Sequence, residues 1–178
     1  EIVQIFAGYV NDGLVDSEFV AVESEHSAMS ACIGSAASGC RTMTATASQG
    51  LALMHEMLFI AAGLRLPMVM IVANRALSVP INIWADHSDV MPERDTGWVQ
   101  LFAENGQDVF DLTVQAFRLA EDPRVLLPVM VNMDGFSLSH VIEPVELLER
   151  EEVVAFLPPF RPPRTLDPRA PRSIGAFG

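Results

Sequence analysis

Short apolar runs alternate with longer helical patterns along most of the chain. Nearly continuous apolar or β-branched runs predict strands at residues 19–22, 43–46, 68–73 and 126–132, with a fifth candidate strand at 99–102. Helical patterns surround them, at residues 2–10, 25–38, 49–62 and 108–121. The alternation predicts βαβ units, and therefore an α/β fold in which a mostly parallel sheet has helices on both faces.

Two stretches show neither the helical nor the strand pattern. Residues 74–98 form a connection longer than a compact domain normally needs, which is typical of a functional segment. From residue 158 onward, prolines with interspersed arginines indicate an extended arm without a core of its own. We therefore expect one domain over residues 1–157 and a Pro-rich arm or linker over 158–178. Because Glu1 lies inside a predicted helix, the chain reads as a fragment or an incompletely represented subunit.

Composition narrows the class of partner. The 178 residues are 50% apolar, which suits one domain with a real core. All eleven basic residues are arginine, and the twenty-three carboxylates leave a net charge of −12, which repels nucleic acid and anionic membranes. The apolar stretches 57–64 and 66–73 are separated by Arg65 and Pro67, and each is far shorter than the ~20 residues of a membrane span. We expect a cytoplasmic protein.

Redox centres are not expected within this chain. Cys32 and Cys40 are the only cysteines, and they lack the Cys-x-x-Cys spacing of zinc or iron-sulfur ligands. The dinucleotide-binding Gly-x-Gly-x-x-Gly, the phosphate-binding loop and the Gly-x-Ser-x-Gly nucleophile elbow are also absent. Any redox centre must therefore come from elsewhere.

Glu25 stands where ligand-binding groups gather in a parallel sheet. It follows the apolar run at 19–22 and opens a helical pattern, at the expected carboxyl end of a strand. If Ser24 caps that helix, Glu25 lies in its first turn, where the helix dipole favours a carboxylate. Position alone favours an ordinary first-turn acid and leaves Glu25 as a candidate catalytic residue.

Ser48 and Gln49 lie between a predicted strand and the helix that follows it. Ser48 is a candidate nucleophile, but its position also suits a helix N-cap whose hydroxyl accepts a backbone N–H. Asp86 and His87, in the Asp-His-Ser-Asp segment, are candidate metal ligands, although Asx turns account for the same residue types. Arg75, just after an apolar strand, can bind a substrate carboxylate with its planar guanidinium or form a structural salt bridge.

Five segments in this order make the pattern specific. They are ESEHSA at 23–28, TATASQGL at 44–51, NRAL at 74–77, DHSD at 86–89 and DGFSLSH at 134–140. Over about residues 14–160 the chain resembles the alpha subunit of pyruvate:ferredoxin oxidoreductases. Relatives that act on 2-oxoglutarate or branched-chain 2-oxoacids usually carry a Ser-Gly-Pro-Gly-type stretch where this chain has Ala47–Gly50, so the resemblance favours pyruvate. The family's Tyr-Pro-x-Thr-Pro-like turn, which precedes the first helix, is missing here.

The resemblance implies a thiamine diphosphate enzyme, with this chain as the domain that binds the coenzyme's aminopyrimidine ring. Glu25 matches the glutamate that hydrogen-bonds N1′ of that ring, and it is therefore both the catalytic and the cofactor-binding candidate. Arg75 matches the arginine that binds pyruvate's carboxylate. Ser48, Gln49, Asp86 and His87 are candidates for lining the pocket or an interface, and no metal ligand is expected in this chain.

The resemblance also implies partners. The coenzyme's diphosphate and its Mg²⁺ would be held by a beta subunit, and [4Fe-4S] clusters by a ferredoxin-like delta subunit or equivalent domains, with a gamma subunit completing the complex. The implied reaction is the coenzyme A-dependent oxidative decarboxylation of pyruvate to acetyl-CoA and CO₂, with electrons passed to ferredoxin. Two alternatives stay open: an oxidoreductase of another 2-oxoacid or of oxalate, and a non-catalytic scaffold domain.

Overall fold

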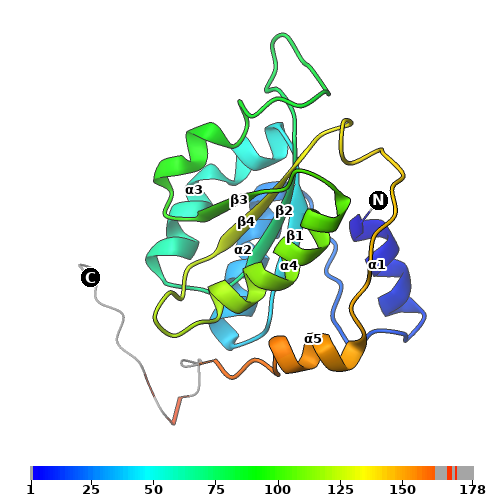
Figure 1. Cartoon of the computed structure of the whole chain (residues 1–178). Coiled ribbons are helices and arrows are strands. Elements are labelled where there is room, and N and C mark those ends of the chain that lie inside the picture. The colour runs from blue at the N-terminus through cyan, green and yellow to red at the C-terminus, as the bar shows by residue number, and fades with distance from the viewer. Residues whose placement is uncertain (1, 163–167, 170, 172–178) are drawn as a thin grey trace.

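Four parallel strands form the centre of the computed structural model, which describes residues 2–162, 168–169 and 171. Their order across the sheet is β1-β2-β4-β3 (Figure 1). The strands are β1 (Met43–Thr46), β2 (Val69–Asn74), β3 (Val99–Phe102) and β4 (Val129–Asp134). The predicted α/β fold with a parallel sheet is confirmed.

The two central strands are buried on both faces, which explains why they read as continuous apolar runs. Alternate residues of β2 enter different clusters: Met70 and Val72 join one hydrophobic core, whereas Val69 and Ile71 join the other. This alternation follows from the two-residue period of a strand. In register, Val69 lies opposite Met43 of β1 and Val129 of β4.

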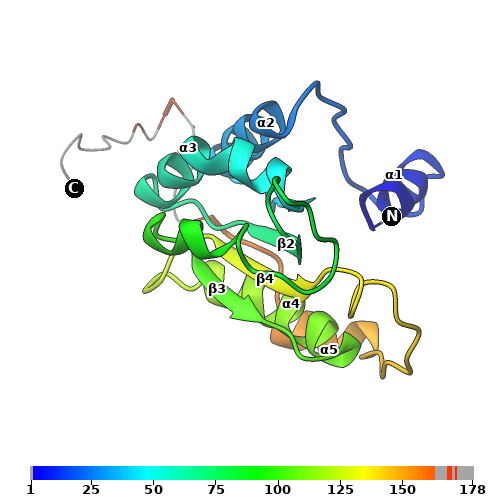
Figure 2. The same ribbon diagram turned by 90° about the horizontal axis from the view of Figure 1, so that it is seen from above.

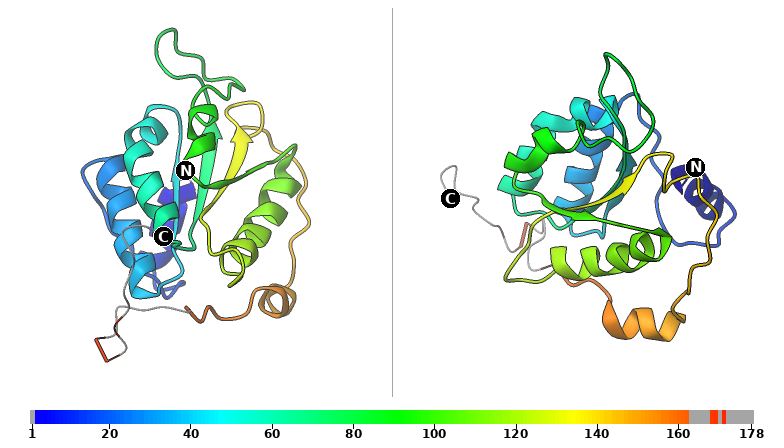
Figure 3. Two further views of the ribbon diagram at one scale, coloured as in Figure 1. Left: turned by 90° about the vertical axis from the view of Figure 1, so that its left-hand side faces the viewer. Right: turned by 45° about the horizontal axis from the view of Figure 1, so that its top comes forward.

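Helices cover both faces of the sheet (Figure 3, left). On one face lie α2 (Glu25–Ser38) and α3 (Gln49–Gly63), whose Met29, Leu51 and Leu58 are fully buried. On the other face lies α4 (Gly106–Ala120), which buries Ala116 and Ala120 against the sheet. The result is a three-layer α/β/α domain, as the sequence predicts.

Side-chain caps set where two of these helices begin. The Ser24 hydroxyl accepts the backbone N–H of Ser27 at 3.2 Å, which confirms the predicted cap and places Glu25 in the first turn of α2. The Asn105 side chain accepts the N–H of Asp108 at 2.9 Å, so α4 begins at Gly106, two residues before the predicted start. Both caps hold a helix start against the carboxyl edge of the sheet.

The predicted strand at residues 19–22 is wrong. The segment is irregular, and Phe19, Val20 and Val22 are 43%, 67% and 41% exposed. Within the described chain β1 is the edge strand and pairs only with β2, so no ladder includes this run. An apolar run becomes a strand only where neighbouring backbone groups pair with it and neighbouring side chains cover it.

Other boundaries shift for local reasons. β4 was expected from residue 126, but Leu126 adopts a positive φ of 45° and Pro128 has no N–H to donate, so pairing starts at Val129. The helix α5 (Arg150–Phe156) was not expected. Its capping box joins Glu149 and Glu152, and a glutamate at the N-cap is a weaker start signal than serine, threonine, aspartate or asparagine.

Two peripheral segments complete the described chain. The helix α1 (Ile2–Asn11), as predicted for residues 2–10, lies to the side of the three layers, next to β1 (Figure 2). The start of the expected Pro-rich arm is tied down where Arg41 Nη2 donates to the Pro158 carbonyl at 2.9 Å. Most of the arm lies outside the described residues. Within the described ranges, none of the helices has the length and apolar content that a membrane crossing requires.

Candidate functional site

The strand connections diverge at the carboxyl edge of the sheet. The segment after β2 returns along the α2/α3 face, where Val90 and Trp98 join the core; it includes the short 3₁₀ helix η1 (Met91–Asp95). The segment after β4 turns to the opposite face, where Leu138 packs beside α4. Because β2 and β4 are neighbours, this divergence is a topological switch point, the usual place for a ligand in an open parallel sheet.

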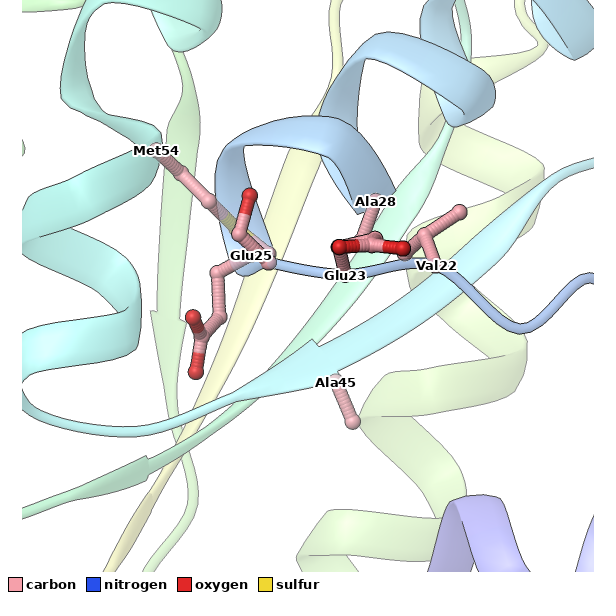
Figure 4. A pocket seen from close by; sticks show the side chains of 7 residues that line it. Val22, Glu23, Glu25, Ala28, Ala45 and Met54 are labelled. Atoms are coloured by element: carbon pink, nitrogen blue, oxygen red, sulfur yellow. The ribbon is translucent and has the colours of Figure 1, made fainter.

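Glu25 lines an open pocket beside that edge (Figure 4). Its side chain extends from the first residue of α2 toward the connection between β1 and α3, away from the Glu23 carboxylate. Glu25 is exposed, and within the described part of the chain no hydrogen bond or ion pair holds its carboxylate. The group is therefore free to bind a ligand.

The pocket suits a flat, partly apolar ring. It is lined by Val22, Glu23, Ser24, Glu25, Ala28, Ala45 and Met54. Its volume of about 260 Å³ is below the roughly 300 Å³ at which pockets for small molecules usually begin. Apolar side chains with two carboxylates fit a heterocycle that carries ring N–H or amino groups, and a larger ligand must extend beyond this chain onto another surface.

Arg75 is half-buried directly after β2, at the switch point. Its backbone N–H donates to Asp89 Oδ2 at 3.1 Å, which fixes the main chain. Its side-chain Nε is buried without a hydrogen-bond partner, and no ion pair of Arg75 is found among the described residues. A buried unpaired donor costs about 1–3 kcal/mol, a penalty that a bound anion would remove.

Asp89 organises the backbone around Arg75. The carboxylate is 1% exposed and accepts three N–H groups: Oδ2 from Ser48 N at 3.0 Å and from Arg75 N, and Oδ1 from Asn74 Nδ2 at 3.1 Å. Asn74 Nδ2 also donates to Asn132 Oδ1 of β4 at 3.2 Å. One buried side chain thus joins the end of β2 to the start of α3. Sequence reasoning left Asp89 without a role, because its partners lie as many as 41 residues away.

Ser48 occupies the N-cap position of α3, but its hydroxyl does not cap the helix. Its oxygen lies 2.7 Å from the Ala76 carbonyl and 2.6 Å from Gln49 Oε1, two acceptors that share its one proton, so the expected N-cap bond is wrong. The backbone takes φ 49° and ψ −121°, a strained conformation for serine that the Asp89 contact helps to hold. With its side chain fully buried, Ser48 shapes the turn and does not face a substrate as a nucleophile would.

Gln49 and His87 connect the long 74–98 segment, to which His87 belongs, with the helix and strand next to it. Gln49 Nε2 donates to the Ser78 hydroxyl at 2.7 Å, joining the start of α3 to this segment. His87 Nε2 lies 2.9 Å from Asp134 Oδ1 at the end of β4. The structure therefore brings both residues to the carboxyl edge of the sheet, near Arg75, as contacts between loops and strands.

Asp86 forms the Asx turn that was the alternative to metal binding. Its Oδ1 accepts the N–H of Ser88 at 2.7 Å. Hydrogen bonds from Ser88, with a smaller contribution from the charge of His87, lower the pKa of Asp86. Among the residues that the structure describes, no three His, Cys, Asp or Glu side chains are grouped so that they could hold a metal ion.

The segment between β2 and β3 contains a buried acid. Glu93 of η1 is 2% exposed, and its Oε2 lies 2.6 Å from His55 Nδ1 of α3. Burial raises the pKa of Glu93, the contact with His55 lowers it in part, and the negative charge of Asp89 raises it further. Folding thus favours the protonated form of Glu93 relative to the unfolded chain.

The raised pKa of Glu93 predicts a pH-dependent stability. The folded state binds the proton more tightly than the unfolded state, so this residue's contribution is fully present below the ordinary pKa of 4.5 and falls as pH rises through the folded pKa. Glu93→Gln removes the titration but keeps an acceptor for His55. We expect its thermal midpoint to exceed the wild-type value by a margin that grows from pH 4.5 to pH 8.

Thermal unfolding of both proteins across that pH range checks the prediction. The matched control is Glu151→Gln, which changes an exposed glutamate of α5 and should follow the wild-type curve. Parallel curves for Glu93→Gln and the wild type would show that the buried acid does not titrate in this way.

Comparison with known proteins identifies the family. Residues 1–177 match the family described as "Pyruvate flavodoxin/ferredoxin oxidoreductase, thiamine diP-bdg". Pyruvate synthase subunit PorA of Thermotoga maritima is 60% identical over 161 residues, 90% of this chain and 41% of that protein. The same subunit of Methanocaldococcus jannaschii is 58% identical over 177 residues, 99% of this chain and 46% of that protein.

Related proteins act on other 2-oxoacids. Ketoisovalerate oxidoreductase subunit VorA of Pyrococcus horikoshii is 48% identical over 177 residues, 99% of this chain and 44% of that protein. A solved structure of 2-oxoglutarate:ferredoxin oxidoreductase from Magnetococcus marinus superposes with a TM-score of 0.61 at 27% identity, covering 71% of this chain and 22% of that one. This chain spans less than half the length of the curated relatives it matches. It belongs to the thiamine diphosphate-binding domain family of the pyruvate flavodoxin/ferredoxin oxidoreductases.

Proposed function

We propose that this chain is the aminopyrimidine-binding part of the catalytic subunit of a pyruvate:ferredoxin oxidoreductase. The enzyme would oxidise pyruvate with coenzyme A to acetyl-CoA and CO₂ and pass the electrons to ferredoxin. The observation that carries the proposal is the Glu25 carboxylate, which has no hydrogen-bond or ion-pair partner among the described residues and lies in a small open pocket at the start of α2. Family membership supports thiamine diphosphate as the ligand of that pocket.

Glu25 would act on the coenzyme's pyrimidine ring. Bound thiamine diphosphate supplies a thiazolium carbon that adds to the carbonyl of a 2-oxoacid. A carboxyl that shares a proton with N1′ would favour the 4′-imino tautomer of the ring, whose nitrogen is the base that this chemistry requires. The pocket's apolar lining, including Val22, Ala28 and Met54, suits the faces of such a ring.

Arg75 would bind the carboxylate of pyruvate. Its buried, unpaired Nε at the switch point is suited to an anion, and a planar guanidinium can bind a carboxylate through two hydrogen bonds. Holding the carboxylate aligns the neighbouring carbonyl for attack. The contact must weaken in the transition state, because decarboxylation disperses the negative charge.

Partner subunits would supply the remaining chemistry. The Glu25 pocket carries two carboxylates, so it repels a diphosphate, which supports its placement, with Mg²⁺, on a beta subunit. Both cysteines of this chain are free and without cluster-ligand spacing, which supports [4Fe-4S] clusters on other subunits or domains. Gamma and ferredoxin-like delta subunits complete the proposed complex.

Pyruvate is the preferred substrate. The pyruvate synthase subunits reach 60% identity to this chain, against 48% for the ketoisovalerate oxidoreductase subunit. In the assembled, thiamine diphosphate-loaded complex, we expect pyruvate to give the highest kcat/KM for coenzyme A-dependent ferredoxin reduction. The comparison substrates are 2-oxoglutarate, 3-methyl-2-oxobutanoate and oxalate. A higher kcat/KM with any of these would replace pyruvate, and no turnover with all four would reject the catalytic assignment.

A further inference from the structure

Gly50, in the first turn of α3, lies directly against the Glu25 side chain. A Cβ atom at this position would lie 3.0 Å from Glu25 Cγ, 3.1 Å from Glu25 Oε1 and 2.5 Å from Thr46 Oγ1. Ordinary contacts of a Cβ atom are 3.4–4 Å, so alanine at this position forces the Thr46 hydroxyl to move and the Glu25 side chain to give by a few tenths of an ångström. Gly50 is buried, so a methyl group at this position would be enclosed by its neighbours.

The backbone conformation does not account for this glycine. Its φ is outside the left-handed region, so an L-residue can adopt the same conformation. A glycine within a helix is also less stable than alanine by roughly 0.5–1 kcal/mol. The other glycine of α3, Gly63, has no atom within 4 Å of a built Cβ. Of these two glycines of α3, only Gly50, which lies next to Glu25, has atoms too close to a built Cβ.

Packing against Gly50 sets the position of the Glu25 carboxylate. Within the described residues no hydrogen bond or ion pair holds the group, and its chain runs from α2 toward the β1–α3 connection (Figure 4). Gly50 and Thr46 form the surface on which it rests. A side chain at position 50 would push the carboxylate outward from this surface, into the pocket that Glu25 lines.

We propose that Gly50 is a positioning residue for the Glu25 carboxylate: the missing side chain leaves the space in which the acid lies at the correct depth to meet a bound aminopyrimidine. The inference rests on the proposed function of Glu25. It assigns a positioning role to a residue that has no functional group of its own. Displacement of a catalytic contact by about 1 Å lowers a rate by roughly 10²-fold, so a shift of a few tenths of an ångström should lower it several-fold.

The test compares Gly50→Ala with Gly63→Ala in the assembled complex. Gly50→Ala should lower kcat and raise the Kd of thiamine diphosphate by about 3- to 10-fold each, as expected for a hydrogen-bonding group displaced by less than about 1 Å. Gly63→Ala, in the same helix and free of contacts, should change both by less than about 2-fold. A Gly50→Ala enzyme with wild-type kcat and Kd would overturn the inference.

The Glu25→Gln background separates positioning from a general structural effect. If Gly50 acts through Glu25, adding Gly50→Ala to Glu25→Gln should raise the coenzyme Kd by less than about 2-fold further, because the contact is already lost. Equal increases in both backgrounds would show that Gly50 acts independently of Glu25. If Glu25→Gln alone is fully active, the proposed role of Glu25 fails, whereas an inactive Glu25→Gln with an active Gly50→Ala overturns only the role of Gly50.

A second variant covers the case in which Gly50→Ala does not assemble. Thr46→Ala removes the hydroxyl that makes the 2.5 Å collision and leaves only the contacts with Glu25. Measured against Thr46→Ala alone, the Thr46→Ala/Gly50→Ala double variant should assemble and keep the loss of kcat and coenzyme affinity. Full recovery of both would show that the collision with Thr46, and not the Glu25 position, was responsible.

Discussion

Replacing Glu25 with glutamine is expected to lower pyruvate turnover by the assembled enzyme by about 10²- to 10⁴-fold, the usual contribution of a positioned acid-base group. Glutamine has nearly the same shape but cannot share an acidic proton with a ring nitrogen. Because Glu25 is exposed and has no protein partner in the described chain, the change removes no internal contact. Assembly and the thermal midpoint of the complex should stay as in the wild type.

Glu56→Gln is the matched control for this experiment. Glu56 is a carboxylate of the neighbouring helix α3, its side chain is 80% exposed, and it does not line the pocket. Turnover should therefore be unchanged. Titration of thiamine diphosphate into both variants adds a second measurement, since only Glu25→Gln should weaken coenzyme binding. Wild-type turnover and coenzyme affinity in Glu25→Gln would favour the scaffold alternative instead.

The central sheet could be predicted because two local signals agree, the apolar strand runs and the helical patterns between them. Residues of β2 and β4 enter the hydrophobic clusters on both faces of the sheet, and helical patterns of adequate length separate the strands. The run at 19–22 obeys the same local rule and is nevertheless irregular. Pairing with a neighbouring strand decides whether such a run becomes a strand, and local sequence carries no information about that neighbour.

The segments that form the site could be predicted from the sequence, but the contacts of several of their residues could not. Glu25, Arg75 and His87 were singled out, and the structure places all three at or near the carboxyl edge of the sheet, where a parallel α/β fold binds its ligands. The role of Asp89 was missed, because it depends on N–H groups contributed by residues 14 and 41 positions away. Ser48 was assigned a capping bond because the preference for serine at helix starts is local, whereas a buried carbonyl 28 residues away takes its hydroxyl.

Arg75→Met is expected to separate substrate binding from stability. Loss of a charge-assisted contact to the substrate carboxylate is worth about 1.5–3 kcal/mol, which corresponds to roughly a 10- to 150-fold lower kcat/KM for pyruvate. Most of the change should be in KM, because the contact is made in the bound substrate and weakens as the charge disperses. Arg75→Lys keeps the charge but loses the planar fork, and should give an intermediate KM.

The same variant should not destabilise the protein. The Nε of Arg75 is buried and unpaired, so methionine removes an unsatisfied donor and no described salt bridge. We expect the thermal midpoint of the pyruvate-free complex to be equal to that of the wild type or higher. Arg94→Met is the control: its side chain is 70% exposed and pairs only with exposed Asp95 at 3.6 Å, an ion pair of little energetic value, so KM and midpoint should both be unchanged. A clear fall in the midpoint of Arg75→Met with an unchanged KM would instead show that the guanidinium stabilises the fold, and the carboxylate-binding role would have to be given up.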